Sequence, residues 1–181
     1  INAPARQSIP ATRTPVLHHD GRDLAAALQT IIEIGDQRAL HDAIDDAFPG
    51  TRLAVDSPGA GRLQASLRQP GLLRALGSSE WSDGTLRYVL LVAALLTPRP
   101  APLMILNEPE TSLHPELIAP LARLITRASA HSQLWVISHS SELVRLLESR
   151  EQSVNHVLEK SLGRTRIAGL SDLDEPHWRW R

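Results

Sequence analysis

The sequence predicts an α/β fold in which a largely parallel sheet is flanked by helices and joined to a small helix and hairpin region. In the second half of the chain, segments of helical periodicity alternate with short apolar runs, the pattern of strands buried on both faces of a parallel sheet. The first half instead places two helical segments before two alternating segments separated by a Pro- and Gly-containing turn. The 181 residues, 42% of them apolar, suffice for one globular domain with a sizeable core.

The first 78 residues divide into two parts. Residues 1–20 are rich in Pro, Ala and Thr, which indicates a linker or the tail of a missing N-terminal part. Residues 21–78 are assigned to an insertion region, because apolar side chains first recur at helical spacing and then alternate. The elements expected there are helices over Asp23–Ile34 and Gln37–Phe48 and hairpin strands over Thr51–Ser57 and Arg62–Gln69.

Residues 79–181 carry the predicted α/β core. Helices are expected over Asp83–Leu96, Glu116–Ala130 and Ser141–Glu148, and apolar strands over Pro102–Leu106 and Gln133–Ser138. The first of these helices stops before a proline, which cannot continue the hydrogen-bond ladder. The segments Asn155–Lys160 and Arg164–Leu170 are joined through Gly163 and are expected to form a closing hairpin.

Composition excludes several classes of function. The net charge of −1 gives no bulk attraction to nucleic acid or to a membrane surface. No apolar stretch approaches the roughly 20 residues that cross a bilayer, so we expect no membrane partner. The absence of cysteine excludes disulfides, thiolate metal sites and cysteine nucleophiles, and a cytoplasmic location fits best. The chain starts without Met or a signal-type apolar segment, so a piece of a longer protein is expected.

Polar side chains end the two apolar strands of the second half. Asn107 and Glu108 follow the first strand and His139 follows the second. Ligands of open α/β sheets bind beyond the carboxyl ends of strands, so neighbouring strands would bring Glu108 and His139 to one edge. A carboxylate there can orient or deprotonate a water, and a side-chain oxygen can hold the waters around Mg²⁺. The alternative is that Ser112 and His139 simply cap the helices that follow.

The stretch Ser82-Asp83-Gly84-Thr85 opens a long helix. Ser82 and the free backbone N–H groups would then face outward at the positive end of the helix dipole, an arrangement that suits a phosphate. The alternative is a plain helix cap with no ligand.

Together these motifs resemble those of ABC-type ATPases, in the right order and spacing. Ser82–Arg87 resembles the signature motif, Leu103–Glu108 the Walker B strand with its catalytic glutamate, Thr111–Pro115 the D-loop, and His139 the switch histidine. The segments "NEPETSLHPE" and "ISHSSELV" are most similar to those of the RecF/SMC-like branch, especially bacterial ATPases related to the overcoming-lysogenization-defect type. The resemblance implies the C-terminal half of a P-loop NTPase domain.

The resemblance also implies a role for each matching residue and two ligands, ATP and Mg²⁺. In such a protein two protomers sandwich two ATP molecules, and hydrolysis opens the clamp. The implied roles are a general base (Glu108), a γ-phosphate contact (His139), a metal-water contact (Asn107), a signature surface that binds the nucleotide of the second protomer (Ser82, Asp83, Gly84, Thr85) and a dimer seam (Ser112, His114). By analogy the setting is DNA maintenance or phage defence, with DNA as a candidate partner.

Two departures from the family pattern affect this interpretation. The Walker A loop needs G-x-x-x-x-G-K-[ST], but the sole lysine, Lys160, has no such glycines before it. We therefore expect a missing N-terminal Walker A half as a further partner. Asn107 occupies the place of the usual metal-ordering aspartate and brings no negative charge, so slower hydrolysis is expected. The alternatives are a non-hydrolysing, ATP-gated regulatory module and a nucleic-acid-binding module.

Five other clusters invite functional interpretations. His18-His19-Asp20 suggests a metal site, but no further ligand lies at suitable spacing. For His114-x-Glu116, packing at the dimer seam is preferred to metal binding. A serine hydrolase at Ser138-His139 is rejected, because adjacent strand residues point to opposite faces and no G-x-S-x-G elbow exists. The terminal Trp178-Arg179-Trp180-Arg181 could stack on nucleic acid, but packing of the Trp side chains against the domain is preferred. A basic patch is conceivable for four arginines, for which solvated surface is the default interpretation: Arg145, Arg150, Arg164 and Arg166.

Overall fold

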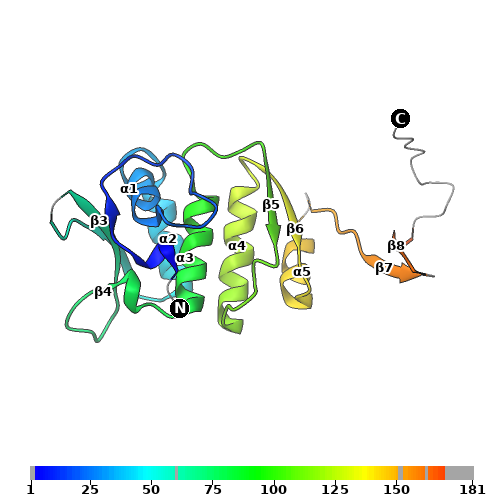
Figure 1. Cartoon of the computed structure of the whole chain (residues 1–181). Coiled ribbons are helices and arrows are strands. Elements are labelled where there is room, and N and C mark those ends of the chain that lie inside the picture. Colours follow the sequence, from blue (N-terminus) through cyan, green and yellow to red (C-terminus); the bar gives the residue numbers. More distant parts are fainter. Residues whose placement is uncertain (1–2, 60, 151–152, 162, 170–181) are drawn as a thin grey trace.

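A computed structural model describes residues 3–59, 61–150, 153–161 and 163–169 (Figure 1). The helices are α1 (Leu24–Ile34), α2 (Gln37–Ala47), α3 (Asp83–Leu95), α4 (Ile118–Ala128) and α5 (Ser141–Glu148), with short 3₁₀ turns at Pro4–Arg6, Ser78–Glu80 and Pro115–Leu117. The strands are β1 (Ile9–Pro10), β2 (Arg52–Asp56), β3 (Arg62–Arg68), β4 (Leu76–Gly77), β5 (Leu103–Asn107), β6 (Gln133–Ile137), β7 (Leu158–Ser161) and β8 (Arg164–Ile167). Each predicted helix and strand is present, with bounds shifted by a few residues.

An antiparallel sheet forms one side of the molecule (Figure 1). The predicted hairpin is confirmed as β2 and β3, and β3 also pairs with β1 and β4. The strand β1 comes from residues 1–20, which are tied to the start of α3 through Arg6. Its guanidinium donates to the Trp81 carbonyl and forms an ion pair with Asp83, both at 2.5 Å. The N-terminal segment therefore helps to position the loop that precedes α3.

One hydrophobic core joins the helix and hairpin region to the α/β region. The helix α3 lies at its centre, where Tyr88, Val89 and Val92 are fully buried. Leu40 of α2 and Leu121 of α4 belong to the same apolar cluster. Because one core serves both regions, α3 is held from two sides, and its N-terminus has a fixed place relative to α2 and α4.

The strands β5 and β6 form a parallel pair, with Asn107 opposite Ile137. The prediction of a largely parallel sheet does not hold for the described residues, where this pair is parallel and the remaining pairs are antiparallel. The prediction that these strands are buried on both faces is also wrong. One face packs on the core, while the other exposes 42–58% of each of four apolar side chains: Leu103, Ile105, Trp135 and Ile137. An apolar run predicts a strand with two apolar faces but does not say what covers them.

The last described elements are β7 and β8. They form an antiparallel pair, which confirms the predicted hairpin. This hairpin lies apart from the body of the molecule (Figure 1). Within the described residues, no helix is both long and apolar enough to cross a membrane.

The turn before α3 is held by an ion pair that predicts a pH dependence of stability. Arg74 contacts Glu80 at 2.6 Å, and the Gly77 N–H donates to the same carboxylate. These hydrogen bonds, that from Arg74 foremost, lower the pKa of the Glu80 carboxyl from 4.5 to about 2. Because the folded pKa is depressed, the stabilisation is present above pH 4.5 and is lost as the pH falls towards about 2.

We therefore expect Glu80→Gln to lower the free energy of unfolding at pH 7, and the difference from the wild type to shrink as the pH is lowered towards 3. Urea unfolding at a series of pH values measures this difference. Arg74→Gln removes the same ion pair from its other side and should show the same trend. A difference that is constant over the whole range would contradict the assignment.

Candidate functional site

The ends of the two parallel strands bring an acid and an imidazole together. Glu108 directly follows β5, and its N–H donates to the Ile137 carbonyl at 2.8 Å, which extends the ladder beyond the strand. The His139 Nε2 atom then lies 3.6 Å from the Glu108 Oε1 atom. The expectation that these two side chains meet at one edge of the sheet is confirmed. The His139 side chain is 86% exposed, so the pair faces solvent and is accessible to a ligand.

The backbone of Glu108 adopts a left-handed conformation, with φ at 45°. This conformation costs a non-glycine residue about 1–2 kcal/mol, and such strain concentrates at functional sites. Three contacts hold it: the Arg87 guanidinium and the Thr111 N–H donate to the Glu108 carbonyl at 2.9 and 3.1 Å, and the Thr111 hydroxyl donates to the Glu108 carboxylate at 3.2 Å. The carboxylate is therefore oriented before any ligand binds.

Glu110 connects the two strand ends, and sequence reasoning assigned it no role. Its Oε1 atom accepts from the Ser138 hydroxyl at 2.5 Å and from the N–H groups of His139 and Ser140 at 3.1 and 3.2 Å. Burial raises the pKa of Glu110, but these hydrogen bonds outweigh it and lower the pKa below its usual value. Glu110 is therefore ionised near neutral pH. The sequence feature that could have indicated this role is that Glu110 is a second acidic residue just after a predicted strand.

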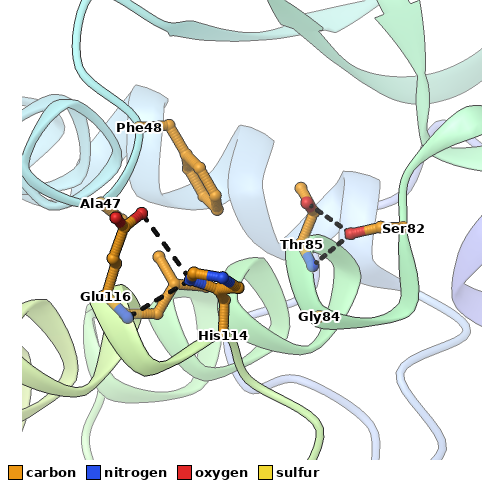
Figure 2. A pocket seen from close by; sticks show the side chains of 8 residues that line it. Ala47, Phe48, Ser82, Gly84, Thr85, His114 and Glu116 are labelled. Carbon is orange, nitrogen blue, oxygen red and sulfur yellow. Dashed lines mark hydrogen bonds and ion pairs between the residues drawn. The ribbon is translucent and has the colours of Figure 1, made fainter.

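The N-terminus of α3 lines a separate pocket of about 280 Å³ (Figure 2). Ser82 is the helix cap that the sequence predicts, because its hydroxyl accepts from the Thr85 N–H at 3.1 Å. Figure 2 shows the Phe48 ring and the His114 imidazole on one side of the pocket and the hydroxyls of Ser82 and Thr85 on the other. Gly84 completes this edge, and the Ser82 side chain is exposed to solvent. Such a helix start suits an anion.

The loop after β5 packs closely against the start of α3. A Cβ atom at Gly84 would lie 2.9 Å from the Ser112 carbonyl oxygen. Ser112 itself has a φ of 66° and does not cap the following helix, as one alternative supposed. His114 takes that place, since its ring accepts from the Glu116 N–H at 3.4 Å. The predicted signature and D-loop residues are thus in contact within one chain.

Gly84→Ala is expected to destabilise the fold by about 1–3 kcal/mol, because the added methyl meets backbone rather than a movable side chain. In open space the same change in a helix would stabilise by about 1 kcal/mol. The sign of the change in the free energy of unfolding, measured in urea, therefore decides whether the contact between Gly84 and Ser112 exists. A stabilised variant would contradict it.

The other candidate residues are placed as follows. Asn107 is exposed at the end of β5, and Asp83 pairs with Arg6 instead of lining the pocket. The possible ligand atoms of His18, His19 and Asp20 lie within 4.8 Å of one another, but the Arg22 guanidinium contacts the His18 ring and would repel a cation. The terminal segment Trp178–Arg181 lies outside the described residues.

The arrangement of strands and helices is similar to that of SMC ATPase head domains. An SMC ATPase structure described by its ATP-driven dimerization and DNA stimulated activation is 20% identical, with a TM-score of 0.59, over 80% of this chain and 87% of that one. The SMC head domain from Thermotoga maritima is 22% identical, with a TM-score of 0.57, over 82% of this chain and 51% of that chain. An SMC head bound to the C-winged helix domain of ScpA is 18% identical, with a TM-score of 0.60, over 87% of this chain and 55% of that chain. The chain thus spans about half the length of these last two heads.

The sequence match identifies the family. Residues 7–145 match the family described as "AAA domain, putative AbiEii toxin, Type IV TA system". Since the match covers more than half of the chain, the protein belongs to this family of P-loop ATPase domains. A comparison with curated proteins finds no match.

Proposed function

We propose that this chain is the C-terminal half of an ATP-hydrolysing clamp that dimerises on ATP. The observation that carries the proposal is the pair formed by Glu108 and His139 at the carboxyl edge of the parallel strands, 3.6 Å apart and exposed. An acid and an imidazole at this edge suit phosphoryl transfer, in which catalysis consists mainly of positioning and electrostatic stabilisation.

In the proposed reaction, Glu108 is the general base that orients the attacking water towards the γ-phosphate. Its carboxylate is suited to this role, because the Thr111 hydroxyl and the Arg87 contact to its carbonyl restrict its orientation. His139 hydrogen-bonds the γ-phosphate and the same water. A positioned base of this kind contributes typically about 10²- to 10⁴-fold to a rate.

The pocket at the start of α3 is assigned to the nucleotide of the second protomer. Ser82 and Thr85 present hydroxyls and Gly84 presents a backbone N–H, groups that suit phosphate oxygens. His114 lies on the opposite wall and, with Ser112, belongs to the proposed dimer seam. The residues lining this pocket do not include Glu108 or His139, which agrees with one protomer serving two different nucleotides.

The open face of β5 and β6 supports the proposal of a Walker A half as a partner. A parallel pair of strands is expected to be covered on both faces, yet Ile105 and Trp135 are more than half exposed. A strand and helix that carry a Gly-rich Lys-Ser/Thr loop would cover this face and place the loop near Asn107.

The metal site in this proposal is weakened by Asn107. Mg²⁺ prefers hard oxygen ligands and usually keeps several waters, and the exposed amide oxygen of Asn107 fits an outer contact to such a water. When bound, Mg²⁺ neutralises charge that develops on the phosphates. Asn107 provides no negative charge of its own, which also favours a second candidate function, a non-hydrolysing ATP-gated switch.

Asn107→Asp is expected to raise the rate of ATP hydrolysis severalfold and to lower the Mg²⁺ concentration needed for half of the maximal rate. The reason is that charge-assisted contacts are roughly twice as strong as neutral ones. A magnesium titration of the assembled protein measures both effects. An unchanged rate and an unchanged Mg²⁺ dependence would show that Asn107 does not limit the reaction.

The proposal is tested by joining this chain to a Walker A half and measuring ATP hydrolysis and mass in solution. We expect hydrolysis only with both halves present, and an ATP-dependent increase in mass to that of a dimer. Dimerisation on ATP without hydrolysis would favour the switch. Salt-sensitive nucleic-acid binding without nucleotide, and without an effect of ATP, would instead favour the nucleic-acid-binding module.

The proposed biological setting, DNA maintenance or phage defence, rests on the family resemblance. The family description names an AbiEii-type toxin, and one structural relative is described by its DNA-stimulated activation. DNA is accordingly the first partner to test, by its effect on the rate of ATP hydrolysis of the assembled protein.

A further inference from the structure

We infer that Glu110 is a positioning residue that fixes His139 relative to Glu108. The inference rests on the proposed ATPase function and adds to it a residue whose side chain contacts the loop that carries His139. It concerns how an exposed imidazole is held in place before a ligand arrives.

The His139 side chain has little packing of its own. It is 86% exposed, and the contact recorded for its ring is the 3.6 Å approach of Nε2 to Glu108. An exposed contact at this distance contributes little energy even when both groups are charged, and it does not hold a side chain in one geometry. The position of the imidazole therefore depends on the backbone that carries it.

Glu110 holds that backbone. One carboxylate oxygen accepts from three consecutive residues, the Ser138 hydroxyl at 2.5 Å and the N–H groups of His139 and Ser140 at 3.1 and 3.2 Å. The Ser138 hydroxyl accepts in turn from the Ser140 N–H at 3.0 Å, which closes the turn. Hydrogen bonds to an ionised acceptor are shorter and roughly twice as strong as neutral ones.

The same residue is anchored beside Glu108. Glu110 lies two residues after it, and its carbonyl accepts from the Leu113 N–H at 3.0 Å, which fixes the loop after β5. One side chain thus joins the loop that carries the acid to the loop that carries the imidazole. The ladder of β5 and β6 aligns the strands, but it ends at Glu108 and leaves the following residues to this contact.

The test compares Glu110→Gln, His139→Ala and the double variant in the protein assembled with its Walker A half. Loss of an outer partner of a metal-binding histidine typically costs roughly 10- to 100-fold in activity, and we expect a fall in kcat of the same order in Glu110→Gln, while KM for ATP changes less than about twofold. In the double variant, kcat should equal that of His139→Ala, because Glu110 acts through His139. Glu142→Gln makes the same change of charge at an exposed position near the start of α5 and should leave kcat unchanged.

Amide hydrogen exchange of this chain gives a readout that does not depend on hydrolysis. Exchange at His139 and Ser140 should be faster in Glu110→Gln, with the rest of the fold protected as in the wild type. Ser138→Ala removes one of the three donors and keeps the carboxylate, so it serves if Glu110→Gln fails to fold; a smaller fall in kcat is expected.

Unchanged exchange at these amides, a wild-type kcat in Glu110→Gln, or rate losses that multiply in the double variant would overturn the inference. The failure of the proposed function has a different signature: Glu108→Gln and His139→Ala would then hydrolyse ATP as fast as the wild type.

Discussion

Glu108→Gln is expected to slow ATP hydrolysis by the assembled protein by roughly 100- to 10,000-fold, the range attributed to a positioned general base. Glutamine keeps the size of the side chain and can still accept from the Thr111 hydroxyl, so the strained turn after β5 should persist. It cannot take a proton from water. The variant should therefore bind ATP and dimerise like the wild type while hydrolysis stops.

Single-turnover hydrolysis measures this effect directly, because it separates the chemical step from product release. Dimerisation on ATP, followed by light scattering, should be retained and prolonged in Glu108→Gln. Glu142→Gln is the matched control, with the same change in charge at an exposed position. If the wild type and Glu108→Gln hydrolyse ATP equally slowly, the chain acts as a switch and the catalytic assignment fails.

Tyr88→Ala is expected to lower the free energy of unfolding by about 3–5 kcal/mol, as is typical when a large buried aromatic side chain is truncated. Tyr88 is fully buried in α3, its ring meets Phe48 edge-on at 5.6 Å, and its hydroxyl donates to the Ala43 carbonyl at 3.2 Å. Burial raises the pKa of this hydroxyl, which therefore stays protonated as a donor. The ring connects α3 to the end of α2.

Tyr88→Phe separates packing from hydrogen bonding, because it keeps the ring and removes only the hydroxyl. We expect it to lower the free energy of unfolding by about 1 kcal/mol, the net value of one hydrogen bond. Urea unfolding of both variants gives the two numbers. Similar losses in both variants would show that the hydrogen bond, and not the ring, accounts for the stability.

Loss of the Tyr88 ring has a second expected consequence, because Phe48 packs on it and also lines the pocket beside Ser82. A Phe48 ring without its partner would no longer form a fixed wall of that pocket. The proposed binding surface for the second nucleotide therefore depends on the core beneath it.

The local elements were predictable from the chain alone. Ser82 caps α3 as expected, because a helix start needs an acceptor for its free N–H groups, and the periodicity of apolar residues located α1 and α4. The meeting of Glu108 and His139 was predictable too, since parallel neighbours bring their carboxyl ends to one edge. These features depend on short-range patterns that the order of residues contains.

Contacts between distant segments were decided by the tertiary structure. The pairing of β1 with β3, the open face of β5 and β6, and the contact between Gly84 and the Ser112 carbonyl follow from how elements pack, and local patterns do not encode packing partners. The same holds for Glu110. It lies 28 residues before Ser138 in the sequence, and the pairing of β5 with β6 brings the two residues together. A local pattern identifies a strand or a cap, whereas the free energy that selects its neighbour is shared across the whole core.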